Sequence, residues 1–82
     1  EIAVEVLSAG SDNEHRDRQV KLRLYSVRGV REYWIVNWRL KTVEVYRWQD
    51  AQLQLVTTLS DEDRLTSPVL PGFECAIAAI FQ

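Results

Sequence analysis

Apolar and polar positions alternate along the chain in short segments of differing period. Residues 2–7 form a run rich in β-branched side chains, which predicts a strand. A second set of apolar residues recurs at helical spacing, namely Val20, Leu24 and Val27, with Leu22 and Tyr25 widening the face. We therefore expect a helix over about residues 12–28, with this set turned toward the core.

The two ends of this helix carry typical capping residues. Ser11 to Glu14 has the form of a capping box, in which a serine hydroxyl and a glutamate bind backbone donors of the first turn. Arg28 follows the last apolar position, where the helix dipole favours a cation. Gly29 suits a left-handed residue that ends the helix.

The next apolar run, residues 33–36, predicts a strand buried on both faces. A strand, a helix and a second buried strand make a βαβ unit, so the two strands are expected to be parallel. Residues 42–48 and 53–59 then alternate as in an antiparallel meander, and their connections have hairpin length. Residues 74–81 predict either a last strand or a short helix.

Composition sets the scale of the domain. With 82 residues, 46% hydrophobic and 27% charged, the chain is one small folded domain or part of one. It lacks methionine and opens inside a strand pattern, so we interpret residues 1–82 as a single-domain fragment, the C-terminal portion of a truncated domain. No apolar run approaches the roughly 20 residues that span a bilayer, and Cys75 has no partner for a disulfide, which fits a cytoplasmic protein.

The charge is unevenly distributed along the chain. Residues 15–47 hold nine Lys or Arg against three acidic residues, a local charge of +6, whereas the whole chain carries −2. A basic segment is compatible with binding to a nucleic-acid backbone, and Arg16 and Arg18 are the candidates for DNA phosphate contacts. The alternative is an ordinary solvated helix and exposed strand faces.

Two charged residues stand out as candidates for chemistry. Glu5 lies between Val4 and Val6 in a strand expected to be central, where a carboxylate is costly unless it is paired or binds a metal. Lys21 lies one helical turn after Asp17, so a simple surface ion pair would also explain it. From the local sequence alone, Glu5 could equally sit solvated at a strand end.

Several segments together resemble one protein family. They are Val4-Glu5-Val6-Leu7-Ser8, Asp17 with Lys21, Tyr25, the run from Gly29 to Val36, and Ser67 to Phe73 with Phe81 near the end. In this order they are similar to the Uma-two family of restriction-endonuclease-like proteins. The run Gly-Val-Arg-Glu-Tyr-Trp-Ile-Val is the most specific part of the match.

The resemblance implies a PD-(D/E)XK nuclease core, an α/β fold with a restriction-endonuclease-like mixed sheet in which the βαβ unit is followed by the meander. It implies hydrolysis of DNA phosphodiesters with Mg²⁺ or Mn²⁺. Glu5 and the backbone carbonyl of Val6 would bind the metal with an aspartate upstream of this chain. Leu7 stands where a catalytic lysine is usual, and the resemblance points to Lys21 as its replacement.

The sequence also allows other ligands and other functions. Glu1 is a conceivable substitute ligand, and Asn37 stands where the family commonly shows aspartate. Without an upstream ligand residues 1–82 would be inactive alone. The same fold could then serve as a non-catalytic DNA-binding module, or could form a homodimer through the exposed first strand or the aromatic strands.

Overall fold

The computed structural model describes residues 2–7 and 14–81, with the backbone alone for residues 14–18. Strands and helices follow along the described chain in this order: β1 (Ile2–Leu7), α1 (Glu14–Val27), β2 (Glu32–Asn37), β3 (Thr42–Gln49), β4 (Gln52–Ser60), β5 (Arg64–Thr66), β6 (Glu74–Ala76) and α2 (Ile77–Ile80). The predicted capping box falls on residues 11–14, most of which lie outside the described part.

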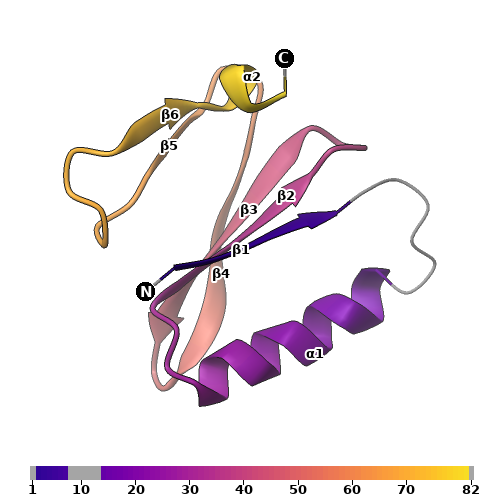
Figure 1. The fold of residues 1–82 in the computed structure, drawn as a ribbon, viewed down its shortest axis with the longest axis vertical. Helices are drawn as coiled ribbons and strands as arrows, with labels where there is room; N and C mark the ends of the chain where they lie inside the picture. Colours follow the sequence, from indigo (N-terminus) through magenta and orange to yellow (C-terminus); the bar gives the residue numbers. More distant parts are fainter. Residues whose placement is uncertain (1, 8–13, 82) are drawn as a thin grey trace.

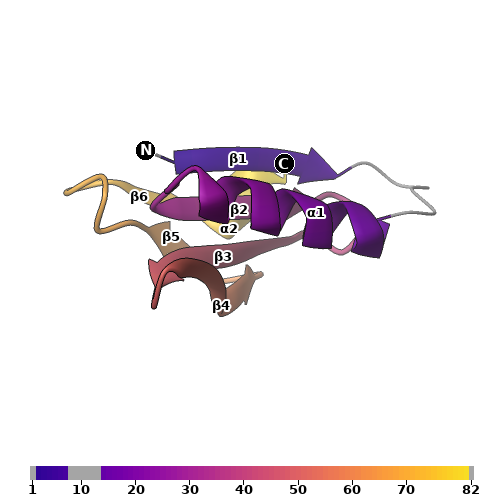
Figure 2. The same cartoon turned by 90° about the horizontal axis from the view of Figure 1, so that it is seen from below.

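Four strands form one mixed sheet in the order β1-β2-β3-β4. β1 pairs with β2 in parallel, so the predicted βαβ unit is confirmed, and β2, β3 and β4 then pair antiparallel as the predicted meander. Figure 2 shows the four strands one beside the next, with α1 crossing in front of them. All six residues of β2 are buried, as expected for a strand covered on both faces.

The C-terminal segment forms a small second sheet. β5 and β6 pair antiparallel, and α2 follows β6 directly. Residues 74–81 were expected to be a strand or a helix, and they contain both in succession. The short strand β5 had no clear signal in the sequence, because Arg64–Thr66 has only one apolar residue and gains its order by pairing with β6.

The two faces of the four-stranded sheet carry separate cores. On the α1 side the core is Tyr33, Ile35, Tyr46 and Leu53, packed by Leu22 and Tyr25 of the helix. On the opposite face it is Trp34, Val36, Val43, Val45, Leu65 and Ile77. Figure 1 shows α1 and the β5-β6-α2 segment on opposite sides of the sheet. Because β2 alternates between them, one strand supplies both cores.

The helix meets the sheet with only part of the predicted apolar face. Leu22 and Tyr25 pack against the sheet, and the Tyr25 ring lies 5.0 Å from that of Tyr33. The predicted stripe is instead exposed, with Val20 at 59%, Leu24 at 42% and Val27 at 82% of its surface open to solvent. A helix can bury only one face on a sheet, and the larger aromatic side chain selects it.

β1 also differs from expectation. The sequence suggested a central strand, but within the described residues β1 pairs only with β2 and lies at the end of the sheet. Val4 and Val6, on the face away from α1, are 54% and 58% exposed. A run of β-branched residues therefore predicted the strand correctly, whereas its place in the sheet depends on which strands pair with it.

Gly29 ends α1 as predicted, with φ of +75°. Its left-handed conformation lets the Val30 N–H bind the Tyr25 carbonyl at 3.1 Å, which turns the chain directly into β2. This turn sets the start of β2 relative to the helix, and with it the position of β2 beside β1.

Candidate active site

Glu5 lies in the middle of β1 with its side chain on the face that α1 covers. In the parallel register it stands opposite Ile35 of β2, which belongs to the core beneath the helix. Its side chain keeps 27% of its surface exposed. The carboxylate is therefore neither fully buried nor freely solvated, which is the situation expected of a group that can meet a ligand from solution.

Lys21 is brought to Glu5 by the packing of α1. Its ammonium group donates a hydrogen bond to Glu5 Oε1 and forms a side-chain ion pair with it. The helix reaches this position because Leu22 and Tyr25, its neighbours on the wheel, are anchored on the sheet. The sequence alone could not decide whether Lys21 meets the Glu5 strand, and the structure places the two side chains together.

The environment of this pair is only partly shielded from water. The Lys21 side chain is 37% exposed and that of Glu5 27%. Opposite charges in such a position attract each other by roughly 1 kcal/mol or less in free energy of folding, because solvent screens them. The pair thus adds little to stability, and its value would lie in holding a carboxylate and an ammonium side by side at the surface.

The backbone carbonyl of Val6 has a direction that follows from the neighbouring hydrogen bond. The Trp38 N–H donates to the Leu7 carbonyl at 3.3 Å, on the β2 side of β1. Successive carbonyls of a strand alternate between its two edges, so the Val6 carbonyl points to the other edge. Among the described strands none pairs with β1 on that side.

These atoms fit a hard divalent cation only in part. Carboxylate and carbonyl oxygens are the ligands that Mg²⁺ prefers, and Glu5 and Val6 offer one of each. In the described part of the chain, however, no group of three or more His, Cys, Asp or Glu side chains could hold a metal ion. The described residues therefore do not make up a complete metal site by themselves.

For the other predicted site residues the structure describes no side chain. Arg16 and Arg18 belong to the first turns of α1, but their side chains lie outside the described residues, and so does Glu1. The candidate DNA-phosphate contacts therefore stay predictions.

Asn37 has a definite structural partner. Its side chain is almost fully buried, at 2% exposure, and Oδ1 accepts a hydrogen bond from the Leu40 N–H at 3.1 Å. This contact closes the turn between β2 and β3. An aspartate, the residue common at this position in the family that the sequence resembles, has the same acceptor atom and could make the same turn contact.

Glu44 and Tyr46 of β3 lie on the same face of the sheet as Glu5, and sequence reasoning did not single them out. Ile35 stands between Glu5 and Glu44 in the two registers. The Tyr46 hydroxyl donates to Glu44 Oε1 at 2.7 Å. The period-two alternation of β3 could have placed both side chains on one face, but only the strand pairing aligns Glu44 with Glu5.

A second ionic cluster lies on the opposite face of the sheet. Glu32 is fully buried; Arg47 Nε donates to its Oε2 at 2.7 Å, and the Ser67 hydroxyl donates to its Oε1. Ser67 Oγ in turn accepts the Val69 N–H at 3.1 Å. Ser67 therefore joins the C-terminal segment to β2 through its hydrogen bond to Glu32.

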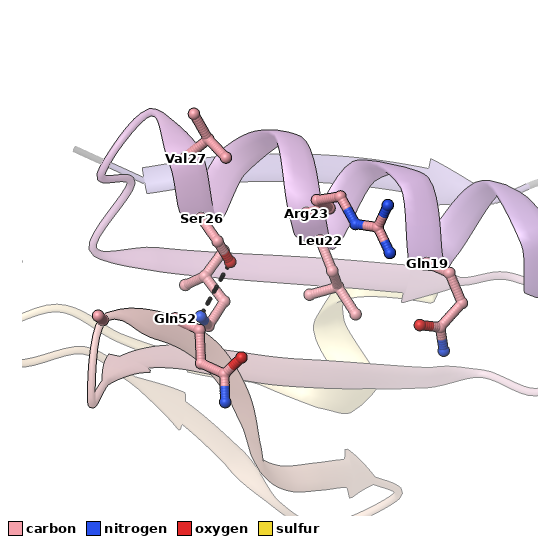
Figure 3. A pocket seen from close by; sticks show the side chains of 8 residues that line it. Gln19, Leu22, Arg23, Ser26, Val27 and Gln52 are labelled. Atoms are coloured by element: carbon pink, nitrogen blue, oxygen red, sulfur yellow. Dashed lines mark hydrogen bonds between the residues drawn. The ribbon is translucent and has the colours of Figure 1, made fainter.

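A hollow of about 420 Å³ opens between α1 and the β3-β4 turn, and it is separate from the Glu5–Lys21 pair. Figure 3 shows Leu22 and Ser26 pointing from the helix toward this hollow, with the Ser26 hydroxyl accepting the Leu53 N–H at 3.0 Å. That hydrogen bond fixes the C-terminal half of α1 on β4. The described residues that line the hollow include no carboxylate that could bind a metal ion.

Taken together, the mixed sheet, the parallel β1-β2 pair and the helix that carries Lys21 to Glu5 define an α/β protein compatible with the restriction-endonuclease-like fold. The particular family follows from its sequence model. The chain belongs to the Uma2 family, described as "Putative restriction endonuclease", whose model matches residues 1–78. This is the family that the motifs indicated. Among curated proteins none matches the chain.

The described helices also bear on the membrane question. Neither α1 nor α2 is long and apolar enough to cross a bilayer.

Proposed function

We propose that this protein is a metal-dependent DNA endonuclease, in which Glu5 and the Val6 carbonyl bind Mg²⁺ or Mn²⁺ and Lys21 stabilises charge on the phosphate. The observation that carries the proposal is the contact between Lys21 and Glu5. The family model supports the activity class, since its description is "Putative restriction endonuclease". DNA follows as the substrate class.

The chemistry explains why these residue types suit the reaction. A bound Mg²⁺ would neutralise developing negative charge and lower the pKa of a coordinated water. Glu5 would hold the cation by an oxygen of its carboxylate. Lys21, held beside that carboxylate, places a positive charge where a non-bridging phosphate oxygen would gain charge in the transition state.

A second acidic ligand is part of this proposal, and it comes from outside residues 1–82. The support is geometric: the Val6 carbonyl points to the edge of β1 that no described strand occupies. A strand paired there would carry an aspartate to the metal from the same side. Residues 1–82 by themselves are then expected to be inactive.

The test is a titration of Mg²⁺ and Mn²⁺ on the full-length protein with supercoiled plasmid DNA, alongside Glu5→Ala and Lys21→Ala. A matched control is available in Arg64→Ala and Glu74→Ala, which remove a surface ion pair with an Nη1–Oε1 distance of 3.4 Å elsewhere in the fold. We expect metal-dependent nicking that both site variants lose and both control variants keep.

Two results would overturn the proposal. Cleavage that persists undiminished in the Glu5→Ala protein would remove Glu5 from the site. Absence of cleavage with any divalent metal, with DNA binding retained, would favour a non-catalytic DNA-binding module of the same fold.

A self-associating module is a second candidate, favoured by the open edge of β1 and the exposed Val4 and Val6. Unpaired strand edges with apolar side chains pair readily with another copy. The aromatic strands offer less surface for such a homodimer, because Tyr33, Trp34 and Tyr46 are buried. Sedimentation equilibrium of the full-length protein tests this candidate, and a monomer at high concentration eliminates it.

A further inference from the structure

The outer face of α1 carries an exposed apolar stripe made of Val20, Leu24 and Val27, here called the outer stripe. The three side chains are 59%, 42% and 82% exposed. Figure 3 shows Val27 pointing away from the sheet, on the side of the helix opposite to Leu22. The helix therefore buries one apolar face on the sheet and presents a second to the outside.

The spacing of the outer stripe matches that of a helix–helix seam. Its members are separated by four and then three residues, which is the a/d repeat of two helices packed side by side. They line a shallow hollow of about 430 Å³ together with Gln19 and Arg23. A continuous apolar strip on a helix, rimmed by polar side chains, is typical of a surface that binds another helix.

Positive charge flanks the outer stripe on both sides. At the 100° per residue of an α-helix, Arg23 falls at about −60° from Val20, on one side of the stripe. Arg28 follows the last residue of α1 and still donates its N–H to the Leu24 carbonyl at 3.1 Å, which continues the helical path and puts it at about +80°, on the other side. Both are exposed, and among the described residues neither makes an ion pair. A second copy of this helix would set arginine against arginine in either orientation, whereas carboxylates would complement them.

We propose that the outer stripe docks an amphipathic helix of a partner protein, with an apolar seam that meets Val20, Leu24 and Val27 and with Asp or Glu residues that pair with Arg23 and Arg28. The partner leaves the Lys21–Glu5 contact in place, because Leu22 and Tyr25 hold the opposite face of α1 on the sheet. The surface is thus an attachment site beyond the nuclease activity proposed above, and it stands independently of that activity.

The experiment uses the full-length protein and two synthetic helical peptides with the same leucine seam. One peptide has glutamate at the positions that flank the seam and the other has lysine there. Fluorescence anisotropy measures the binding of each at low ionic strength. We expect the acidic peptide to bind at least about tenfold more tightly than the basic one, and Leu24→Glu to weaken it by about tenfold or more.

Reversing the charge of the two arginines is the most specific test of the proposed ion pairs. In the double variant Arg23→Glu, Arg28→Glu the preference should switch to the basic peptide. Leu40→Glu is the matched control, because Leu40 is 60% exposed in the turn between β2 and β3 and lies outside α1. It should leave peptide binding unchanged. Thermal unfolding checks that all variants remain folded.

Three outcomes would overturn the proposal. The first is equal binding, or no binding, of the two peptides. The second is concentration-dependent self-association that Leu24→Glu abolishes, which would make a second copy the occupant. The third is binding of anionic lipid vesicles through the same residues without binding of the acidic peptide, which would make the stripe a membrane contact.

Discussion

The ammonium of Lys21 on α1 contacts the carboxylate of Glu5 on β1, although 16 positions separate the two residues in the chain. The contact exists because Gly29 turns the chain back after the helix and β2 pairs in parallel with β1. A βαβ unit thus converts a distant pair of charged residues into one local cluster.

The Glu5–Lys21 pair should matter far more to activity than to folding. Because both side chains are partly exposed, the coupling free energy in a double-mutant cycle of Glu5→Gln and Lys21→Met should be about 0–1 kcal/mol by urea unfolding. DNA cleavage by each single variant should fall by about 100-fold or more. Unfolding and cleavage that change in proportion would instead indicate a structural pair.

Arg16 and Arg18 are predicted to contact the DNA backbone. Replacing either with alanine should lower the magnitude of the slope of log affinity against log salt concentration by about 0.9 per lost phosphate contact. The measurement is fluorescence anisotropy with a DNA duplex over a range of salt concentrations. Arg64→Ala, in the small second sheet, serves as the control, and an unchanged slope in both α1 variants contradicts the prediction.

The buried Glu32 should be a strong determinant of stability. Glu32→Ala leaves Arg47 without its counter-charge and Ser67 without its acceptor, so the free energy of unfolding should drop by about 3 kcal/mol. Ser67→Ala should cost about 1 kcal/mol, because it removes one hydroxyl that bridges Glu32 and the Val69 N–H. Urea unfolding measures both, and equal small losses would show that the cluster contributes little.

Variants of Asn37 test whether this residue holds the turn between β2 and β3 or takes part in catalysis. Asn37→Ala removes the acceptor of the Leu40 N–H in a buried position and should cost about 1–2 kcal/mol in the free energy of unfolding. Asn37→Asp keeps that acceptor and should be more stable than the alanine variant. If Asn37→Asp instead raised cleavage markedly while leaving stability unchanged, the position would belong to the active site.

The segment from Ser67 to Phe81 packs against β2 and the turn that follows it. The Phe73 ring lies 5.8 Å from that of Trp34 and is stacked on it, and Phe81 meets Trp38 edge-on at 5.1 Å. Ser67 binds Glu32. Two sequence segments that were recognised separately are therefore one packed unit, and no periodicity in either segment could have revealed this.

Local patterns determined much of this fold. The β-branched run gave β1, the Gly29 signal gave the end of α1, and the alternating runs gave the antiparallel β3 and β4. These features follow from interactions within a few residues, where backbone propensity, capping and turn chemistry act directly. The family was also readable from the motifs, since the order of residues along the chain is itself sequence information.

Only the tertiary structure decided which face of α1 meets the sheet. The helix offers two apolar faces, and packing of Tyr25 on Tyr33 selected one and left Val20, Leu24 and Val27 outside. That choice also carries Lys21 to Glu5, and the strand pairing aligns Glu44 with Glu5 across Ile35. Such relationships depend on strand pairing and on competition between faces for one buried surface, so residues far apart in the chain determine them.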